Sequence, residues 1–273
     1  MSEAAALDQG GARPARPIIR RIAPGAPVEW LRRGWQDMVK TRFRGSLYGI
    51  LFVLMGYTIS SVYSTRWQLT MGLIAGFFLV GPFLACGIYE LSRQLQRGER
   101  LDVIASLLCW QRNPGSIGFF GIMLTFAMII WARVSLIVFA LFSTTEFPTL
   151  QRLLTTVFST DNLEFLLVWT VVGFVFASIV FAIGVISAPL MLDRRTDTMT
   201  AVIASVQSLL KNPAALYFWA VLIVLIVGAS LLLGFVPLII TAPLVGHATW
   251  HAYEALVDWT AGDPAGAAGQ SRP

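Results

Sequence analysis

The stretch Val103-Ile104-Ala105-Ser106, followed after six residues by Asn113-Pro114, recurs as Val202-Ile203-Ala204-Ser205, six residues and Asn212-Pro213. Each copy of this cassette runs directly into a long apolar segment, so the sequence predicts an internally repeated membrane protein. A weaker third copy is seen at Gly45-Ser46, which follows Trp30-Leu31-Arg32-Arg33-Gly34-Trp35-Gln36-Asp37. We therefore expect three repeats, at about 28–92, 99–192 and 197–258.

The composition indicates that water is not the main solvent of this chain. Hydrophobic residues make up 56% of the 273 positions and charged residues 13%, against roughly 25% charged residues in a soluble domain. The apolar residues gather into runs of about 20, which is the length that crosses a bilayer as a helix. Six such runs predict an all-α bundle of six transmembrane spans: Ser46 to Ser64, Leu69 to Leu91, Ile117 to Phe142, Phe165 to Met191, Leu216 to Leu233 and Phe235 to Leu256. The break between the last two is placed at Gly234 and Pro237.

Basic residues indicate the orientation. Seventeen of the 20 Lys and Arg residues lie on one side of the predicted spans, only Arg66 and Arg152 on the other, and Arg133 within a span. This bias predicts that both termini are cytoplasmic. Residues 1–27 have no apolar core and predict a disordered basic tail rather than a signal peptide, and 259–273 predict a second disordered tail. Cys86 and Cys109 have no paired spacing, so we expect no disulfide.

Each repeat is expected to comprise a cytoplasmic amphipathic helix, an outward span and a return span, so that the spans form three helical hairpins. In the third repeat, Val202, Ile203, Val206, Leu209 and Leu210 share one helical face, opposite Thr200, Gln207 and Ser208. The return spans carry Pro82, Pro189 and Pro243 near their cytoplasmic ends, where we expect kinks.

Four motifs resemble a family of predicted bacterial integral membrane proteins of unknown function. They are Gly34-Trp35-Gln36-Asp37, the stretch from Gly81 to Arg93 (GPFLACGIYELSR), Leu192-Asp193-Arg194-Arg195, and the stretch from Gly246 to Tyr253 (GHATWHAY). The resemblance runs from about Trp30 to Asp258. It implies a bacterial inner-membrane location and no established activity. Some members carry a cytochrome c oxidase label, which would imply an association with a respiratory complex.

His247 and His251 are the only histidines, and their four-residue spacing places them on one face of the sixth predicted span, with Glu254 one turn further on. Such a face could hold a transition metal or a haem iron. The favoured interpretation is packing and hydrogen bonding at the membrane interface beside Trp250 and Tyr253. Two histidines are too few for the six ligands of a haem-copper oxidase subunit, so we expect no cofactor.

Arg133 is the one charge well inside a predicted span, which makes it a candidate functional residue. It could pair with Glu164 or bind an anionic substrate or lipid. Equally, its side chain could extend to the external headgroups.

Charged residues also follow two of the return spans. Glu90 with Arg93, and Asp193 with Arg194 and Arg195, could form an ion-pair network among the repeats. Solvated helix ends that face anionic lipids are the favoured alternative.

No motif specifies a reaction, because the chain has no phosphate-binding glycine loop, nucleophile elbow or zinc-protease helix. The leading hypothesis is a non-enzymatic membrane protein that binds lipids or partners, as an accessory or assembly factor of a respiratory complex. The second is a transporter of small solutes or lipids, with Arg133 and the proline kinks along its path. The third is a metal or haem protein that uses His247 and His251. Nucleic acid is not an expected partner.

Overall fold

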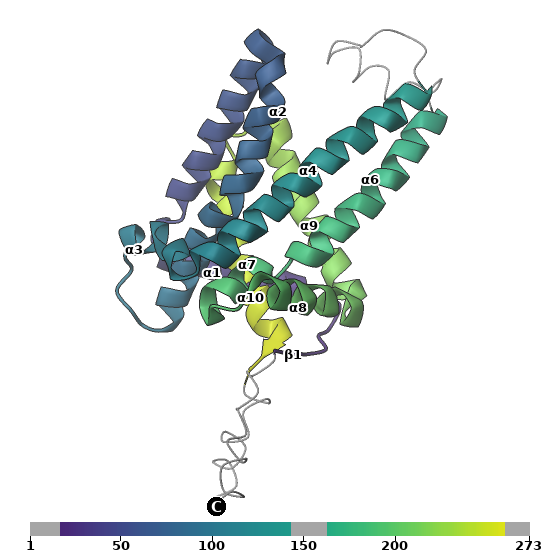
Figure 1. Ribbon diagram of the computed structural model, residues 1–273. Coiled ribbons are helices and arrows are strands. Elements are labelled where there is room, and N and C mark those ends of the chain that lie inside the picture. The colour runs from purple at the N-terminus through teal and green to yellow at the C-terminus, as the bar shows by residue number, and fades with distance from the viewer. Residues whose placement is uncertain (1–16, 143–162, 260–273) are drawn as a thin grey trace, which may run out of the picture.

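The computed structural model describes residues 17–142 and 163–259 as a bundle of helices joined at one end by short surface elements (Figure 1). The predicted tails therefore fall mostly outside the described residues, as do Glu146 and Arg152 of the predicted external loop. Within the described ranges, five stretches are long and apolar enough to cross a membrane: Ser46–Tyr63, Gly72–Gln96, Pro114–Phe142, Leu163–Arg194 and Pro213–Leu232.

Helix α2 (Ser46–Gln96) covers the first two predicted spans as one helical run. Its two ends nevertheless lie together, because Tyr48 packs against Ile88 and Leu91. A straight helix rises about 1.5 Å per residue and would hold residues 48 and 88 roughly 60 Å apart. The chain therefore reverses within α2, between its two candidate spans, and the two arms lie side by side (Figure 1).

Helices α4 (Pro114–Phe142) and α6 (Leu163–Gly184) pack on each other and lean away from α2 (Figure 1). Beyond α6 the chain breaks at Val185 and Ile186, and α7 (Ser187–Arg194) begins. The kink predicted at Pro189 is thus a helix break, with the proline in the first turn of the new helix. Its missing N–H is no loss there, because the first four N–H groups of a helix have no intrahelical partner.

Helices α9 (Pro213–Leu232) and α10 (Leu238–Leu256) are separated where the sequence predicted the break. Gly234 and Phe235 take up left-handed backbone conformations, with φ of 81° and 68°. Pro243 lies inside α10, as Pro82 lies inside α2. Helix α10 is not among the five candidate spans, since its second half carries His247, His251 and Glu254.

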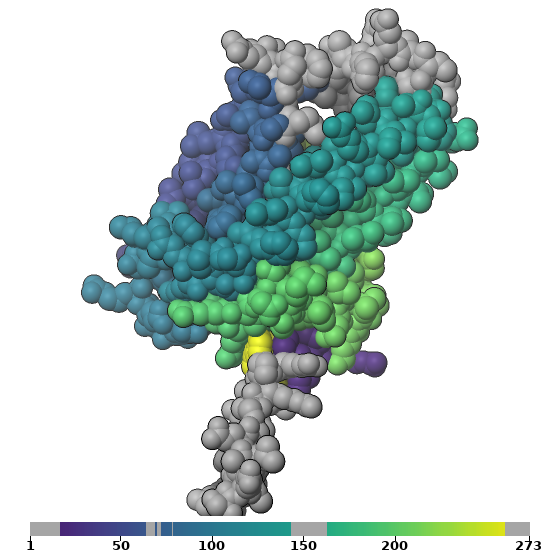
Figure 2. Space-filling view, viewed as in Figure 1, coloured from purple at the N-terminus to yellow at the C-terminus, as the bar shows by residue number. Residues whose placement is uncertain are grey.

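The remaining elements form what we call the base, the end of the bundle where both described ends of the chain lie. It comprises α1 (Ala26–Lys40), α3 (Val103–Leu107), the 3-10 helix η1 (Cys109–Arg112), α7, α8 (Thr198–Lys211), β1 (Ile18–Ile19), β2 (Val257–Asp258), the second half of α10, and the last turns of α2 with the segment that leads to α3. Helix α8 runs across the foot of α4, α6 and α9, and α4 rises obliquely above it (Figures 1 and 2).

The strand β1 corrects the predicted boundary of the N-terminal tail. It pairs antiparallel with β2, and Arg20 forms an ion pair with Asp258 at 2.6 Å. Ile19 is buried in the core. Two adjacent β-branched apolar residues suit a short strand, so residues 18 and 19 do not belong to a disordered tail.

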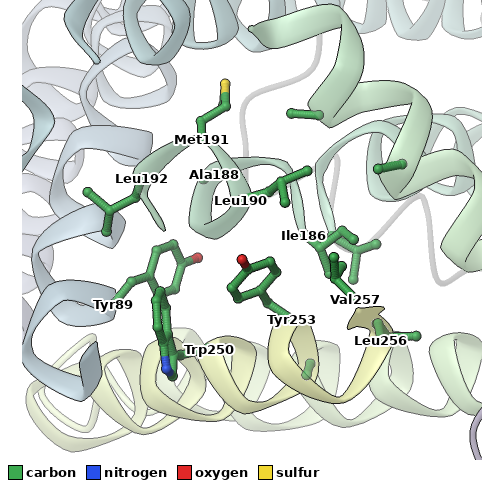
Figure 3. Close-up of a cluster of buried hydrophobic side chains, with 14 of the residues drawn as sticks. Tyr89, Ile186, Ala188, Leu190, Met191, Leu192, Trp250, Tyr253, Leu256 and Val257 are labelled. Atoms are coloured by element: carbon green, nitrogen blue, oxygen red, sulfur yellow. The ribbon is translucent and has the colours of Figure 1, made fainter. Parts of the chain in front are cut away.

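The main core lies in the base rather than between the spans. Figure 3 shows the rings of Tyr89 of α2 and Tyr253 of α10 facing one another between α7 and α10, and Leu190 and Leu192 of α7 belong to the same buried cluster. The arms above the base are far more exposed: 6% of the residues in the apolar window of α4 and 0% in that of α6 are buried.

Candidate functional site

Three helices cross closely in the base because glycines lie at the contacts. A Cβ added to Gly34 of α1 would lie 2.7 Å from the backbone nitrogen of Ala248 in α10. A Cβ added to Gly246 would lie 2.7 Å from Cγ2 of Ile88 in α2. Any side chain at these positions would push the helices apart, so the two glycines fix the approach of α1 and α2 to α10.

A chain of buried polar side chains occupies this crossing. Asp37 of α1 accepts a hydrogen bond from Ser92 Oγ of α2 at 2.9 Å, and its Oδ2 lies 2.9 Å from Nε2 of His251 in α10. Ser92 Oγ also lies 2.7 Å from Nδ1 of His247. All four side chains are buried, and each helix contributes at least one of them. The contacts join three helices that are far apart in the sequence.

The hydrogen-bond inventory fixes the roles within this chain. Ser92 donates its one proton to Asp37, so its oxygen must accept from His247. His247 therefore carries its proton on Nδ1, and its buried Nε2 has no hydrogen-bond partner among the described residues. Ser92 Oγ and His251 Nε2 both lie 2.9 Å from Oδ2 of Asp37.

The chain continues to the surface through Glu254. Its Oε2 lies 3.4 Å from Nδ1 of His251 and accepts a hydrogen bond of 2.6 Å from Gln96 Nε2. Gln96 Oε1 in turn accepts from the indole of Trp250 at 3.0 Å. Each histidine thus has one ring nitrogen within hydrogen-bond distance of a side chain, while His247 Nε2 and His251 Nδ1 make no hydrogen bond among the described residues.

The two histidine rings face different partners. No three His, Cys, Asp or Glu side chains converge on a point that could hold a metal ion in the part of the chain that the structure describes. Nε2 of His251 faces Asp37, and Nδ1 of His247 faces Ser92, which leaves the two rings engaged separately.

A second buried cluster centres on Glu90 of α2, which is fully buried. Arg93 and Arg112 each donate two hydrogen bonds to its carboxylate, at distances of 2.7 to 3.0 Å. Arg112 belongs to η1, so the cluster joins the first and second repeats. The favoured prediction of solvated helix ends is therefore wrong for Glu90 and Arg93, because a carboxylate between two arginines can be buried with its charge compensated.

Asp193 forms the third polar contact between repeats. It accepts a hydrogen bond from the hydroxyl of Tyr253 at 2.8 Å, and an ion pair joins it to Arg97 at 3.4 Å. Arg194 lies 3.2 Å from the same carboxylate. The alternative that the sequence left open, an ion-pair network among the repeats, agrees with these contacts.

The ends of the cassettes make one kind of contact three times. Asn113 donates to the carbonyl of Thr196, two residues before α8, at 2.8 Å. Asn212 donates to the carbonyl of Arg20 at 2.9 Å, in the segment that leads into α1. Arg44, which aligns with Pro114 and so lies one residue after the place of the cassette asparagine, donates to the carbonyl of Leu101, two residues before α3, at 2.6 Å. Each contact runs to the segment before the next surface helix, and the last returns to the first, so the three contacts close a ring.

The cassette serines are also buried, which explains part of the repeat. Ser106 Oγ lies 2.7 Å from the hydroxyl of Tyr48, and Ser205 Oγ accepts from the Ile186 N–H that the break after α6 leaves free, at 3.4 Å. Asp102 and Asp197 cap the helices that carry these serines. The hydrogen bonds from Thr200 hold the pKa of Asp197 below its usual range.

The other candidate pair is not brought together. Arg133 of α4 and Glu164 of α6 are both exposed, and no ion pair joins them within the described residues. The contacts between α4 and α6 are aromatic instead: Trp131 stacks on Phe176 with ring centroids 5.4 Å apart. Arg133 therefore points away from the helix contacts.

Sequence reasoning missed Asp37 and Ser92 as members of the site. Asp37 occurs in the motif Gly34-Trp35-Gln36-Asp37, where a carboxylate three residues after a helix-crossing glycine was a usable signal. Ser92 carried no signal, because a lone serine near a helix end is most often solvated.

These observations define an all-α integral membrane protein with its polar side chains gathered in the base. Residues 69–193 match a family model described as "Predicted integral membrane protein (DUF2189)". The match covers part of the predicted resemblance and leaves out the motifs at 34–37 and 246–253. No curated protein and no solved structure matches the chain.

Proposed function

We propose that the protein is a non-enzymatic lipid-binding protein of the bacterial inner membrane, whose base lies in the cytoplasmic leaflet and its headgroups. The observation that carries this proposal is the exposed apolar stripe on each of the surface helices. In this arrangement the chain crosses the membrane six times as three hairpins, the last crossing being completed by the first part of α10. Both termini are then cytoplasmic, in agreement with the bias of basic residues.

Helix α1 has its stripe at Val28, Trp35 and Val39, which are 47% to 58% exposed. These positions are seven and four residues apart and share one face, opposite the buried Trp30 and Asp37. The inner face packs on α9 and α10, so the stripe is directed outward.

Helix α8 repeats the pattern. Met199, Ile203 and Leu210 are 52% to 74% exposed, and Ala201, Ala204 and Ser208 are buried on the opposite face. The sequence placed Leu209 on the apolar face and Ser208 on the opposite, polar face, and both are buried. The small residues thus pack inward, and the outward face is the larger apolar one.

The second and third repeats expose an equivalent residue of the cassette. Ile104 of α3 and Ile203 of α8 occupy the same cassette position and are 70% and 52% exposed. Leu108 extends the stripe beyond α3. Apolar stripes with Lys40 and Arg42 nearby suit a surface of anionic headgroups over acyl chains, where each basic residue contributes about 1 kcal/mol.

The test is the depth of the stripes in a bilayer. Spin labels on cysteines introduced at Ile104 and Ile203 are compared with a label at Glu99, an exposed polar position of the base, in nanodiscs of phosphatidylethanolamine and phosphatidylglycerol. Oxygen is expected to relax the first two labels more than a water-soluble nickel chelate does, and the reverse is expected at Glu99. Greater accessibility to the nickel chelate at all three positions would contradict the proposal.

A further inference from the structure

The loop between α1 and α2 holds two consecutive residues in a strained backbone conformation. Arg42 and Phe43 have φ of 52° and 56°, and neither is glycine. A side chain with a Cβ is strained in this conformation, and such strain persists only where surrounding contacts hold it. Here the Phe43 N–H donates to the Met38 carbonyl at 3.0 Å, and the buried Thr41 hydroxyl donates to the same carbonyl at 3.0 Å.

The strain places an aromatic ring on the surface between two arginines. Phe43 is 44% exposed, and Arg42 and Arg44 beside it are exposed as well. Trp35 of α1, itself 47% exposed, meets the Phe43 ring edge-on with centroids 6.5 Å apart. The described residues leave both rings partly exposed. The free energy of exposing such an aromatic pair is lower in a lipid interface than in water.

The two arginines are not equivalent. Arg44 is held by the Leu101 carbonyl, so its guanidinium is fixed near the loop. No ion pair of Arg42 occurs within the described residues. Its fork of N–H donors matches the geometry of a phosphate.

Connectivity fixes the depth of the loop. Gly45 directly follows Arg44, and the first candidate span begins at Ser46. A loop one or two residues from a span lies at the boundary between headgroups and acyl chains. The exposed stripe of α1 continues into it through Trp35 and Val39.

We propose that Arg42, Phe43, Arg44 and Trp35 form a docking site for the headgroup of an anionic phospholipid. The Arg42 guanidinium binds the phosphate, and the two aromatic rings lie among the upper carbons of the acyl chains. The site rests on the proposed function and adds to it a lipid class and a position.

The experiment measures binding of phosphatidylglycerol to the full chain in a neutral detergent by native mass spectrometry, with phosphatidylcholine as the reference lipid. The variants are Arg42→Gln and Phe43→Ser. The control is Arg195→Gln, which is exposed and has a φ of 52° but lies outside the loop. Arg42→Gln is expected to weaken binding of phosphatidylglycerol about fivefold, the effect of one basic side chain at an anionic surface, and Phe43→Ser to weaken binding of both lipids.

Melting of each variant without added lipid separates loss of the site from loss of the fold. Equal affinity of Arg42→Gln and the unchanged chain, or an equal loss in Arg195→Gln, would overturn the site. Stabilisation by inorganic phosphate alone would also overturn it, because that outcome describes a free-anion site. If the spin labels place the base in the leaflet and these variants bind normally, only the docking site fails. If the base is in water, both proposals fail.

Discussion

The base and the arm formed by α4 and α6 are built from the same chain on opposite principles. In the second half of α10, every residue from Gly246 to Tyr253 is buried, including both histidines. In the arm, the apolar window of α6 has no buried residue. Lipid is as apolar as leucine, so apolar side chains have no reason to leave it, and close packing with polar contacts has to hold the helices. The base has both the close packing and the polar contacts. We therefore expect the base to provide most of the stability of the bundle.

The largest expected effect comes from Glu90. Glu90→Gln leaves Arg93 and Arg112 without their carboxylate, and breaking a buried ion pair in this way costs about 3–5 kcal/mol. Unfolding by SDS in mixed micelles measures the loss. Glu29→Gln, on the exposed surface of α1, should leave the unfolding free energy nearly unchanged, because water and salt screen an exposed ion pair. If the two variants lost the same unfolding free energy, the claim that the buried ion pair stabilises the protein more than the surface pair would be contradicted.

The glycine crossing should give the next largest effect. Gly34→Ala adds a Cβ 2.7 Å from a backbone atom of Ala248, so α1 must move and the cost is about 1–3 kcal/mol. Gly25→Ala is the matched control, because a Cβ there would meet nothing within 4 Å. Melting in the same detergent compares the two. If the two variants had the same melting temperature, the close contact between Gly34 and Ala248 would be contradicted.

Asp37 allows a finer test, because its effect should be coupled to that of Ser92. Asp37→Asn and Ser92→Ala each leave a buried partner short of a hydrogen bond, at about 1–3 kcal/mol. The double variant should lose less than the sum, since the two residues share one contact. A double-mutant cycle on the unfolding free energy measures this coupling. Additive losses would place the two side chains apart.

The last prediction is that the two cysteines do not react with a thiol reagent in the folded protein. Burial raises the pKa of the Cys109 thiol to about 12, so very little thiolate exists at pH 8. Cys86 is fully buried as well. The time needed for a maleimide to label both thiols completely is first measured in SDS. Over the same time in the folded protein, mass spectrometry should detect no labelling of either thiol. Rapid labelling of Cys109 before unfolding would show an open base.

The sequence predicted the elements better than it predicted their contacts. Apolar runs of bilayer length and the turn at Gly234 follow from composition and local backbone preference, which is why those helices were foreseen. The prediction for α8 failed at Ser208, because the buried face of this helix includes small residues such as Ala204 and Ser208, and a hydropathy pattern gives such a serine to the polar face. Asp37 and Ser92 meet the histidines only through the crossing at Gly34, a contact over about 200 residues that no local pattern contains.

The most direct test of the central claim compares one buried residue of the base with one exposed residue of the arm. Leu190 of α7 is fully buried, and Phe126 of α4 is 62% exposed. The account predicts that Leu190→Ala lowers the unfolding free energy by about 2–5 kcal/mol, and that Phe126→Ala changes it by less than about 0.5 kcal/mol. A loss in Phe126→Ala as large as that in Leu190→Ala would contradict the claim that the base holds the bundle together.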